Sequence, residues 1–161
     1  MRPRAADKDI LFELQQVPAL PPVAVDAARF RHVLANLLEN ALTYTERGGK
    51  ITLSAKARDD KVIFAVADTG IGIPPEYQSY VFNKFFRVPG QSEEGGTGLG
   101  LALAREIVAA HGGAIQCRSE VGAGSIFEIA LPVWKTPASP QLPRDGSSDT
   151  KTPVSAPKIH A

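Results

Sequence analysis

The sequence predicts an α+β fold, a two-layer α/β sandwich whose mixed, mostly antiparallel sheet of about five strands is covered on one face by three helices. Three observations lead to this prediction. Apolar residues recur at i, i+3 and i+4 in two long stretches, which is typical of amphipathic helices. In shorter stretches they alternate with polar residues, mostly in pairs that read as hairpins. Helices and hairpins follow one another in segregated runs, which favours α+β over a parallel α/β sheet.

The composition is that of an ordinary globular domain. Of 161 residues, 43% are hydrophobic and 22% charged, and 18 basic against 17 acidic residues give a net charge of +1. This balance does not favour nucleic acid or an anionic membrane as a partner. The single cysteine, Cys117, excludes an intrachain disulfide and fits a reducing cytosol. No apolar run approaches a membrane span, so we expect a cytoplasmic location without membrane contact by this chain.

The N-terminal third predicts a strand, a stiff connector and a long helix. Ile10, Phe12 and Leu14 alternate as in a short strand. After a proline-rich connector, Asp26 is a suitable N-cap for a helix that ends at Gly48-Gly49. The apolar positions of this helix keep helical spacing for over three turns: Phe30, Val33, Leu34, Leu37, Leu38, Ala41 and Leu42.

Two hairpins and two further helices are predicted after it. Strands through Ile51–Leu53 and Val62–Val66 flank a turn at residues 58–60. Pro74-Pro75-Glu76 begins a short helix, and a polar, glycine-rich loop follows at residues 87–96.

A second long helix is predicted from Thr97 to Ala110, closed by Gly112-Gly113. The last two strands, Ala114–Ser119 and Ser125–Leu131, turn at residues 122–124. Almost no bulky apolar residue follows Trp134. We therefore expect one domain over residues 1–134 and a disordered C-terminal tail over 135–161.

Polar residues of the first long helix form a line along one face. Asn36, Asn40 and Tyr44 are four residues apart and border the apolar stripe. The two amides could face a ligand at the rim of the core, where an amide oxygen suits Mg²⁺. Taken alone, two asparagines are more typical of solvated positions or of a cap on a neighbouring loop.

Two glycine-rich segments carry the other candidate contacts. Asp68, at the end of a strand, precedes Gly70 and Gly72; its carboxylate could accept a hydrogen bond from an exocyclic amine, or it could simply close an Asx turn. The second segment, from Gly96 to Leu101, opens a helix, an arrangement suited to phosphate. Its spacing matches neither a Walker A loop nor a dinucleotide fingerprint. Each segment alone is weak evidence; their combination with the two amides indicates a nucleotide site.

Four segments, in this order and spacing, resemble the N, G1, F and G2 boxes of the ATP-binding catalytic domain of bacterial sensor histidine kinases, which have a Bergerat-type fold. They read NLLENALTYT, DTGIGIP, VFNKFFR and GGTGLGL. The resemblance covers almost all of residues 8–134, and it implies ATP and Mg²⁺ as cofactors, with ADP as the product.

The resemblance also implies a role for each matching residue. Asn40 would coordinate Mg²⁺, Asn36 would lie near the phosphates, and Tyr44 would pack on the adenine. Asp68 would bind the adenine amino group. The rest of the base would be surrounded by Gly70, Gly72, Ile73 and Ser125.

The phosphate side is implied in the same way. Arg87 would act on the γ-phosphate, and the phosphates would meet the G2 loop of Gly96, Thr97, Gly98, Leu99, Gly100 and Leu101. Phe82, Phe85 and Phe86 match the F box. Together with Asn36 and Asn40, Arg87 would be the catalytic set.

Two departures and one omission qualify this picture. Thr43 stands where the family usually has lysine, so one phosphate contact is either missing or supplied by Lys84 or Arg87. Related hydrolytic ATPases carry glutamate at the position of Asn36. The absence of this glutamate here favours phosphoryl transfer over activation of water, and Glu39 is not assigned as a base. None of the three histidines, His32, His111 and His160, has the setting of a phosphoacceptor.

We therefore expect a fragment that binds Mg-ATP and donates the γ-phosphate to a histidine on a separate dimerisation domain, with a response regulator downstream. The loop at residues 88–95 is expected to be mobile and to close over the phosphates. Alternatives are a hydrolytic ATPase of the same fold, a serine-directed kinase of this fold, and an interaction module without nucleotide.

Overall fold

The fold was determined as a computed structural model, which describes residues 8–15, 19–91 and 96–135. The elements, in chain order, are β1 (Leu11–Leu14), α2 (Ala27–Tyr44), β2 (Lys50–Arg58), β3 (Lys61–Asp68), α3 (Pro75–Gln78), α4 (Gly100–Ala110), β4 (Ala114–Glu120) and β5 (Gly124–Pro132). The strands form one sheet in the order β1-β2-β3-β5-β4. Only β1 pairs in parallel, with β2; the other pairs are antiparallel.

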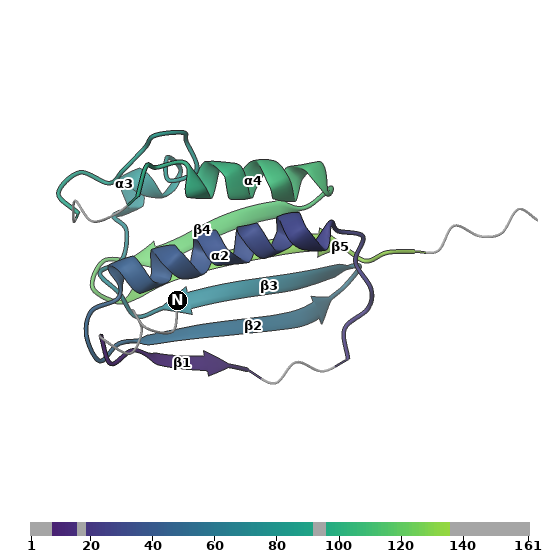
Figure 1. The fold of residues 1–161 in the computed structure, drawn as a ribbon, viewed down its shortest axis with the longest axis horizontal. Helices are drawn as coiled ribbons and strands as arrows, with labels where there is room; N and C mark the ends of the chain where they lie inside the picture. Colours follow the sequence, from purple (N-terminus) through teal and green to yellow (C-terminus); the bar gives the residue numbers. More distant parts are fainter. Residues whose placement is uncertain (1–7, 16–18, 92–95, 136–161) are drawn as a thin grey trace, which may run out of the picture.

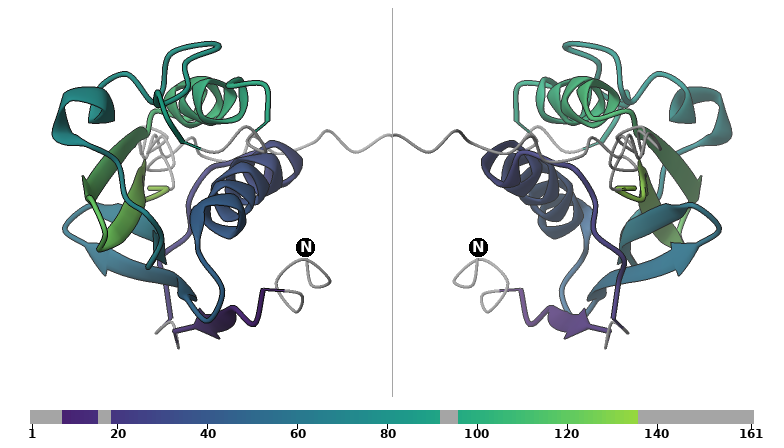
Figure 2. Two further views of the ribbon diagram at one scale, coloured as in Figure 1. Left: turned by 90° about the vertical axis from the view of Figure 1, so that its left-hand side faces the viewer. Right: turned by 90° about the vertical axis from the view of Figure 1, so that its right-hand side faces the viewer.

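The predicted fold class is confirmed. All three helices lie on the same side of the five-stranded sheet, so the domain has two layers (Figures 1 and 2). Most of the tail, from residue 136, and residues 92–95 of the predicted mobile loop lie outside the described residues. Within the described part, no helix has both the length and the apolar character needed to cross a membrane.

The core lies between the sheet and the two long helices. Alternating residues of β3 and β5 point toward the helices, and α2 and α4 contribute their apolar stripes. Fully buried core side chains include Val33, Leu37, Ile51, Val62, Val66, Val108, Ile129 and Leu131. The helix stripe predicted from spacing is thus the buried face of α2.

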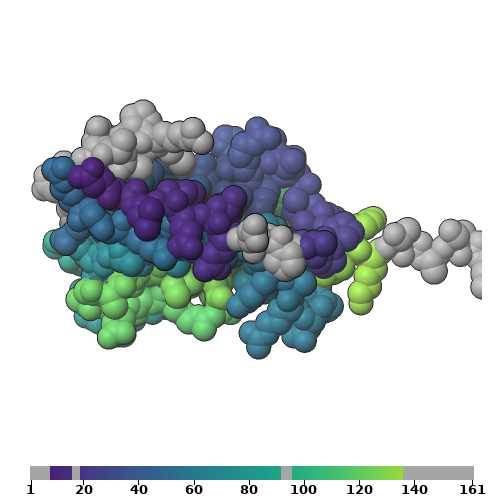
Figure 3. Space-filling view, turned by 90° about the horizontal axis from the view of Figure 1, so that it is seen from below, coloured from purple at the N-terminus to yellow at the C-terminus, as the bar shows by residue number. Residues whose placement is uncertain are grey.

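The predicted first strand is confirmed as β1, but its alternating apolar residues are not buried as a set. The alternation of Ile10, Phe12 and Leu14 does not bury one face, because Phe12 and Leu14 are 47% and 66% exposed and only Ile10 is buried. The reason is position: β1 is the open edge of the sheet (Figure 3), beyond the reach of α2.

Both long helices are shorter than predicted. Helix α2 ends at Tyr44 because Thr45 is extended, with φ −86° and ψ 130°. The Lys8 ammonium donates to the carbonyls of Leu42, Thr43 and Thr45 and so satisfies this helix end. Helix α4 begins at Gly100 and not at Thr97, since Gly98 has a φ of 73° that no α-helix accepts.

The start of α2 and the end of α4 are tied together. Asp26 is the N-cap predicted for α2, and its carboxylate accepts from the backbone N–H groups of Ala28 and Arg29 at 2.9 and 3.0 Å. The His111 ring accepts from the Asp26 N–H at 3.0 Å and donates to the Ile107 carbonyl at 2.7 Å. His111 therefore has a structural role, which agrees with its lacking the sequence setting of a phosphoacceptor.

Candidate nucleotide-binding site

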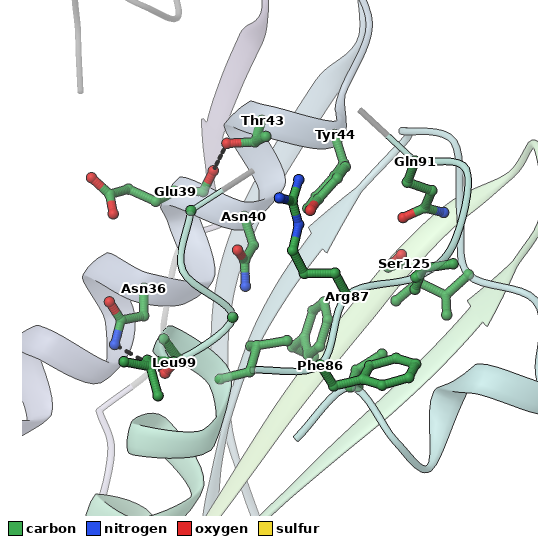
Figure 4. A pocket seen from close by; sticks show the side chains of 18 of the residues that line it. Asn36, Glu39, Asn40, Thr43, Tyr44, Phe86, Arg87, Gln91, Leu99 and Ser125 are labelled. Atoms are coloured by element: carbon green, nitrogen blue, oxygen red, sulfur yellow. Dashed lines mark hydrogen bonds between the residues drawn. The ribbon is translucent and has the colours of Figure 1, made fainter. Parts of the chain in front are cut away.

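A cavity of about 570 Å³ lies among α2, the loop after β3, the segment after α3 and the beginning of α4 (Figure 4). It is lined by Asn36, Glu39, Asn40, Thr43, Tyr44, Asp68, Gly72, Ile73, Val81, Phe86, Arg87, Val88, Gln91, Gly96, Thr97, Gly98, Leu99, Gly100, Leu101, Leu103, Ser125 and Phe127. A volume of this size suits a nucleotide-sized ligand.

Almost every site residue predicted from the sequence lines this cavity. The four-residue spacing of Asn36, Asn40 and Tyr44 does place all three on the cavity side of α2. Gly70 and Lys84 are the exceptions. Gly70 lies behind Asp68, whose carboxylate accepts from the Gly70 N–H at 2.9 Å. The Lys84 ammonium forms an ion pair with Glu106 of α4 at 2.8 Å.

One end of the cavity is built around Asp68, the last residue of β3. Its Oδ1 accepts from Gly70 N, which is the Asx turn, and from Ser125 N of β5 at 3.3 Å. The Asx turn and a ligand-binding role are thus compatible, because a carboxylate has two oxygens. Burial raises the pKa of Asp68, against the lowering effect of these two N–H groups.

The loop after Asp68 is fixed by neighbours on both sides. Ile71 N donates to the Tyr44 carbonyl at 3.2 Å, and Gly122 N, from the turn between β4 and β5, donates to the Ile71 carbonyl at 2.9 Å. Ile73 N donates to the Ser119 hydroxyl at 2.7 Å. Hydrogen bonds of main-chain groups therefore fix the shape of this end of the cavity.

The other end is formed by the beginning of α4. The Asn36 amide donates to the Gly100 carbonyl at 3.1 Å, which couples the predicted phosphate loop to α2 (Figure 4). Leu99, the N-cap of α4, supplies no side-chain cap. The first N–H groups of this eleven-residue helix thus face the cavity end without an acidic cap, where the helix dipole favours an anion.

Arg87 and the polar residues of α2 line the space between these ends. The Arg87 side chain points toward Asn40 and Tyr44 (Figure 4). The Thr43 hydroxyl donates back to the Glu39 carbonyl at 2.8 Å, within the helix. Thr43 therefore adds no charge to the cavity, and among the lining residues Arg87 is the cation.

The donor chemistry is compatible with Mg²⁺ only if the nucleotide brings part of the coordination shell. The described residues contain no group of three or more His, Cys, Asp or Glu side chains that could hold a metal ion. Asn40 offers a neutral amide oxygen, a ligand type that Mg²⁺ accepts beside phosphate oxygens and water. The residues present fit an ion carried in by the nucleotide.

The three phenylalanines of the predicted F box have different environments. Phe82 is buried against Phe127, with ring centroids 6.3 Å apart. Phe86 lines the cavity and packs between Tyr77 and Tyr80. Phe85 is 72% exposed and has a φ of 63°, and its N–H donates to the Gly98 carbonyl at 3.0 Å. This bond joins the F box to the phosphate loop.

Several lining residues were not predicted: Glu39, Val81, Val88, Gln91, Leu103 and Phe127. Val81, Val88, Leu103 and Phe127 are apolar side chains whose contact with a cavity was not evident from the sequence. Gln91 is different, because it follows Val88-Pro89-Gly90, a turn sequence within the stretch predicted to be a mobile loop.

Comparison with known proteins is consistent with this geometry. Residues 25–135 match the family described as histidine kinase-, DNA gyrase B-, and HSP90-like ATPase. The chain is 40% identical over 131 residues to the alginate biosynthesis sensor protein KinB of Pseudomonas aeruginosa, covering 81% of this chain and 22% of KinB. Across three such relatives the chain spans 17 to 36% of their length.

Two solved structures are similar over most of the chain. Full-length ShkA in complex with AMPPNP is 36% identical with a TM-score of 0.73, covering 84% of this chain and 28% of ShkA. Histidine kinase ThkA in complex with the response regulator protein TrrA is 26% identical with a TM-score of 0.67, covering 83% of this chain and 37% of ThkA.

Proposed function

The chain belongs to the histidine kinase-, DNA gyrase B- and HSP90-like ATPase family, as a catalytic domain of the sensor histidine kinase type, and we propose that it binds Mg-ATP and donates the γ-phosphate to a histidine on a separate dimerisation and phosphoacceptor domain. The single observation that carries this proposal is the cavity itself. It has a carboxylate at one end and a helix N-terminus at the other, with two amides and an arginine between them.

The base would occupy the Asp68 end. Asp68 has one oxygen engaged by Gly70 and Ser125, which leaves the second to accept a hydrogen bond from the exocyclic amine of adenine. Guanine presents a carbonyl at that position and would leave the carboxylate facing another acceptor. Tyr44 would pack on the ring. Selectivity for adenine would therefore follow from this one half-buried carboxylate.

The phosphates would occupy the α4 end. Backbone N–H groups from Gly96 to Leu101 and the dipole of α4 favour negative charge there. A Mg²⁺ ion bound by Asn40 would neutralise charge between the phosphates. Arg87 would stabilise the charge that develops on the transferred group.

In the transfer, a ring nitrogen of the acceptor histidine forms a bond to the γ-phosphorus while the bond to the bridging oxygen of ADP breaks. An imidazole needs no deprotonation by the kinase before attack through its free nitrogen. This agrees with an amide, Asn36, at the position where hydrolytic relatives carry a glutamate. Catalysis by this chain would then consist of positioning and charge stabilisation.

The acceptor domain and a response regulator are the proposed partners, in a cytoplasmic location. The solved complex of ThkA with a response regulator is a precedent in a relative. Among the histidines of this chain, His111 is engaged at both ring nitrogens, which argues against it as the acceptor.

The test is calorimetric titration of ATP, GTP and ADP, with and without Mg²⁺, into the wild type and Asp68→Asn. We expect adenine nucleotides alone to bind, more weakly to the variant, and a labelled acceptor domain then to gain acid-labile phosphate. Lack of binding to any nucleotide would contradict the proposal. Phosphate release without an acceptor would identify a hydrolytic ATPase, and acid-stable label would identify a serine-directed kinase.

A further inference from the structure

Three successive carbonyl groups in the loop after Asp68 are each held by a different element. The Ile71 carbonyl accepts from Gly122 N at 2.9 Å, in the turn between β4 and β5. The Ile73 carbonyl accepts from the Gln78 carboxamide at 3.0 Å, at the end of α3. Between them, the Gly72 carbonyl accepts from the Gln91 carboxamide at 2.8 Å. Gln91 comes from the segment that follows Arg87.

Gln91 is held in place by a tight turn. Gln91 N lies 3.3 Å from the Val88 carbonyl, Pro89 occupies the second position of the turn, and Gly90 has a φ of 77° at the third. This is the pattern of a type II turn, in which proline fixes one dihedral angle and glycine accepts the left-handed one. The turn directs the Gln91 side chain back across the segment toward Gly72.

The two glutamines that hold this loop differ in one respect. Gln78 bridges the carbonyls of Ile73 and Ser119, at 3.0 and 2.7 Å, and does not line the cavity. Gln91 is a lining residue and lies near Ser125, at the end of the cavity opposite Asn36 (Figure 4). Gln78 therefore serves the fold, whereas Gln91 joins the two walls at one end of the binding space.

We propose that Gln91 is a positioning residue for the nucleoside half of the bound nucleotide, acting through its bond to the Gly72 carbonyl. This inference rests on the proposed function. The bond holds the Val88–Gln91 turn against the loop at Gly72. These two segments form the wall beside the proposed base site, so this wall is in place before the ligand enters. A ligand then loses less binding energy to ordering that wall.

This role makes a specific prediction about which nucleotides are affected. Gln91 lies at the end of the cavity away from Asn36 and the proposed phosphate site. Its substitution should therefore raise the Kd for ATP and the Kd for ADP by the same factor. Arg87→Ala, by contrast, should weaken the binding of ATP more than that of ADP, since the proposed contact of Arg87 is with the γ-phosphate. Removing one neutral hydrogen bond corresponds to a roughly two- to tenfold change in Kd.

The experiment compares Gln91→Met, Gln91→Glu, Gln116→Ala and Arg87→Ala with the wild type by calorimetry with Mg-ATP and Mg-ADP, together with thermal unfolding of each protein without nucleotide. Methionine keeps the length of Gln91 without its donor, and glutamate places a carboxylate oxygen against the Gly72 carbonyl. Gln116, exposed on β4, is the matched control.

We expect equal loss of ATP and ADP affinity in Gln91→Met, a larger loss in Gln91→Glu, and wild-type Kd and Tm for Gln116→Ala. Unchanged Kd values in both Gln91 variants would overturn the inference and leave the proposed function intact. Loss of ATP affinity alone would also overturn it, because Gln91 would then act at the phosphates. Lack of nucleotide binding by the wild type would overturn both proposals.

Discussion

At the Asp68 end of the cavity Gly70 and Gly72 both pack against main chain. At the other end Gly96 and Gly100 have space beside them, and only Gly98 is enclosed, because a Cβ there would lie 2.9 Å from the Phe85 carbonyl carbon. A Cβ added at Gly72 would lie 2.0 Å from the Glu120 carbonyl oxygen, and one added at Gly70 would lie 2.3 Å from that of Tyr44. A Cβ at Gly96 would meet nothing within 4 Å, and one at Gly100 would make only ordinary contact with Asn36, at 3.5 Å.

This difference separates two uses of glycine in one site. In the Asp68 loop glycine allows main chain to pack against main chain, so that end of the cavity has its shape without ligand. In the phosphate loop Gly96 and Gly100 leave room around the backbone, which a phosphate could fill, while Gly98 packs against the main chain at Phe85. The first end is therefore suited to selecting a base, and the second to accepting a flexible chain of phosphates.

The contrast between the two ends can be tested most directly by adding one methyl group at each end. Gly72→Ala should destabilise the domain by about 2–5 kcal/mol, because a φ of 71° is unfavourable for alanine and the β4–β5 turn must move. Gly96→Ala should change stability by less than about 0.5 kcal/mol. Chemical denaturation of both variants measures the difference; similar losses in the two would refute the contrast.

The next largest effect is expected on nucleotide affinity when the charge of Asp68 is removed. Asp68→Asn should raise the Kd for ATP about ten- to a hundredfold, the range for losing a hydrogen bond to a charged acceptor. Calorimetry beside GTP measures this. A variant that gains no tolerance of GTP and binds ATP normally would show that Asp68 does not read the base.

Without nucleotide, the same variant should be no less stable than the wild type at neutral pH. Burial raises the pKa of Asp68 in the folded state. Its contribution to stability is therefore full below the unfolded-state pKa and is lost as the pH rises through the folded-state pKa. The Tm difference between Asp68→Asn and wild type should favour the variant at pH 7 and disappear below about pH 4.

A smaller effect is expected at the phosphate end. Asn36→Ala removes the bond to the Gly100 carbonyl and should lower the free energy of unfolding by about 1 kcal/mol, while weakening ATP binding through a less well-placed loop. Denaturation and calorimetry measure the two effects, with Asn83→Ala, an exposed asparagine, as control. Loss of stability with unchanged Kd would assign Asn36 to the fold alone.

The smallest effect concerns Cys117, behind the Asp68 end. Burial, followed by the nearby charge of Asp68, raises the pKa of this thiol to about 12. Its thiolate fraction at pH 8 is then about one in ten thousand, so alkylation of the folded protein should be far slower than for a free thiol. Asp68→Asn should speed it slightly. Rapid labelling of the native wild type, followed by mass spectrometry, would contradict the raised pKa of this thiol.

The sequence alone determined the helix faces and the continuous motifs of this protein, because apolar periodicity and turn-forming residues act locally. The apolar spacing of Phe30 to Leu42 specifies which face of α2 is buried, and the four-residue spacing of Asn36, Asn40 and Tyr44 specifies that they share the cavity side. The boxes around Asp68 and Gly96–Leu101 were recognisable for the same reason: each is a continuous stretch.

Contacts between distant segments were decided only by the tertiary structure. The exposure of Phe12 depends on β1 being an edge strand, and the pairing of Lys84 with Glu106 depends on where α4 lies. Gln91 joins the site only because a turn brings its carboxamide to a carbonyl nineteen residues earlier in the chain. Such partners cannot be found by spacing, since the free energy of a hydrogen bond depends on where the two groups meet in space and not on how far apart they lie in the chain.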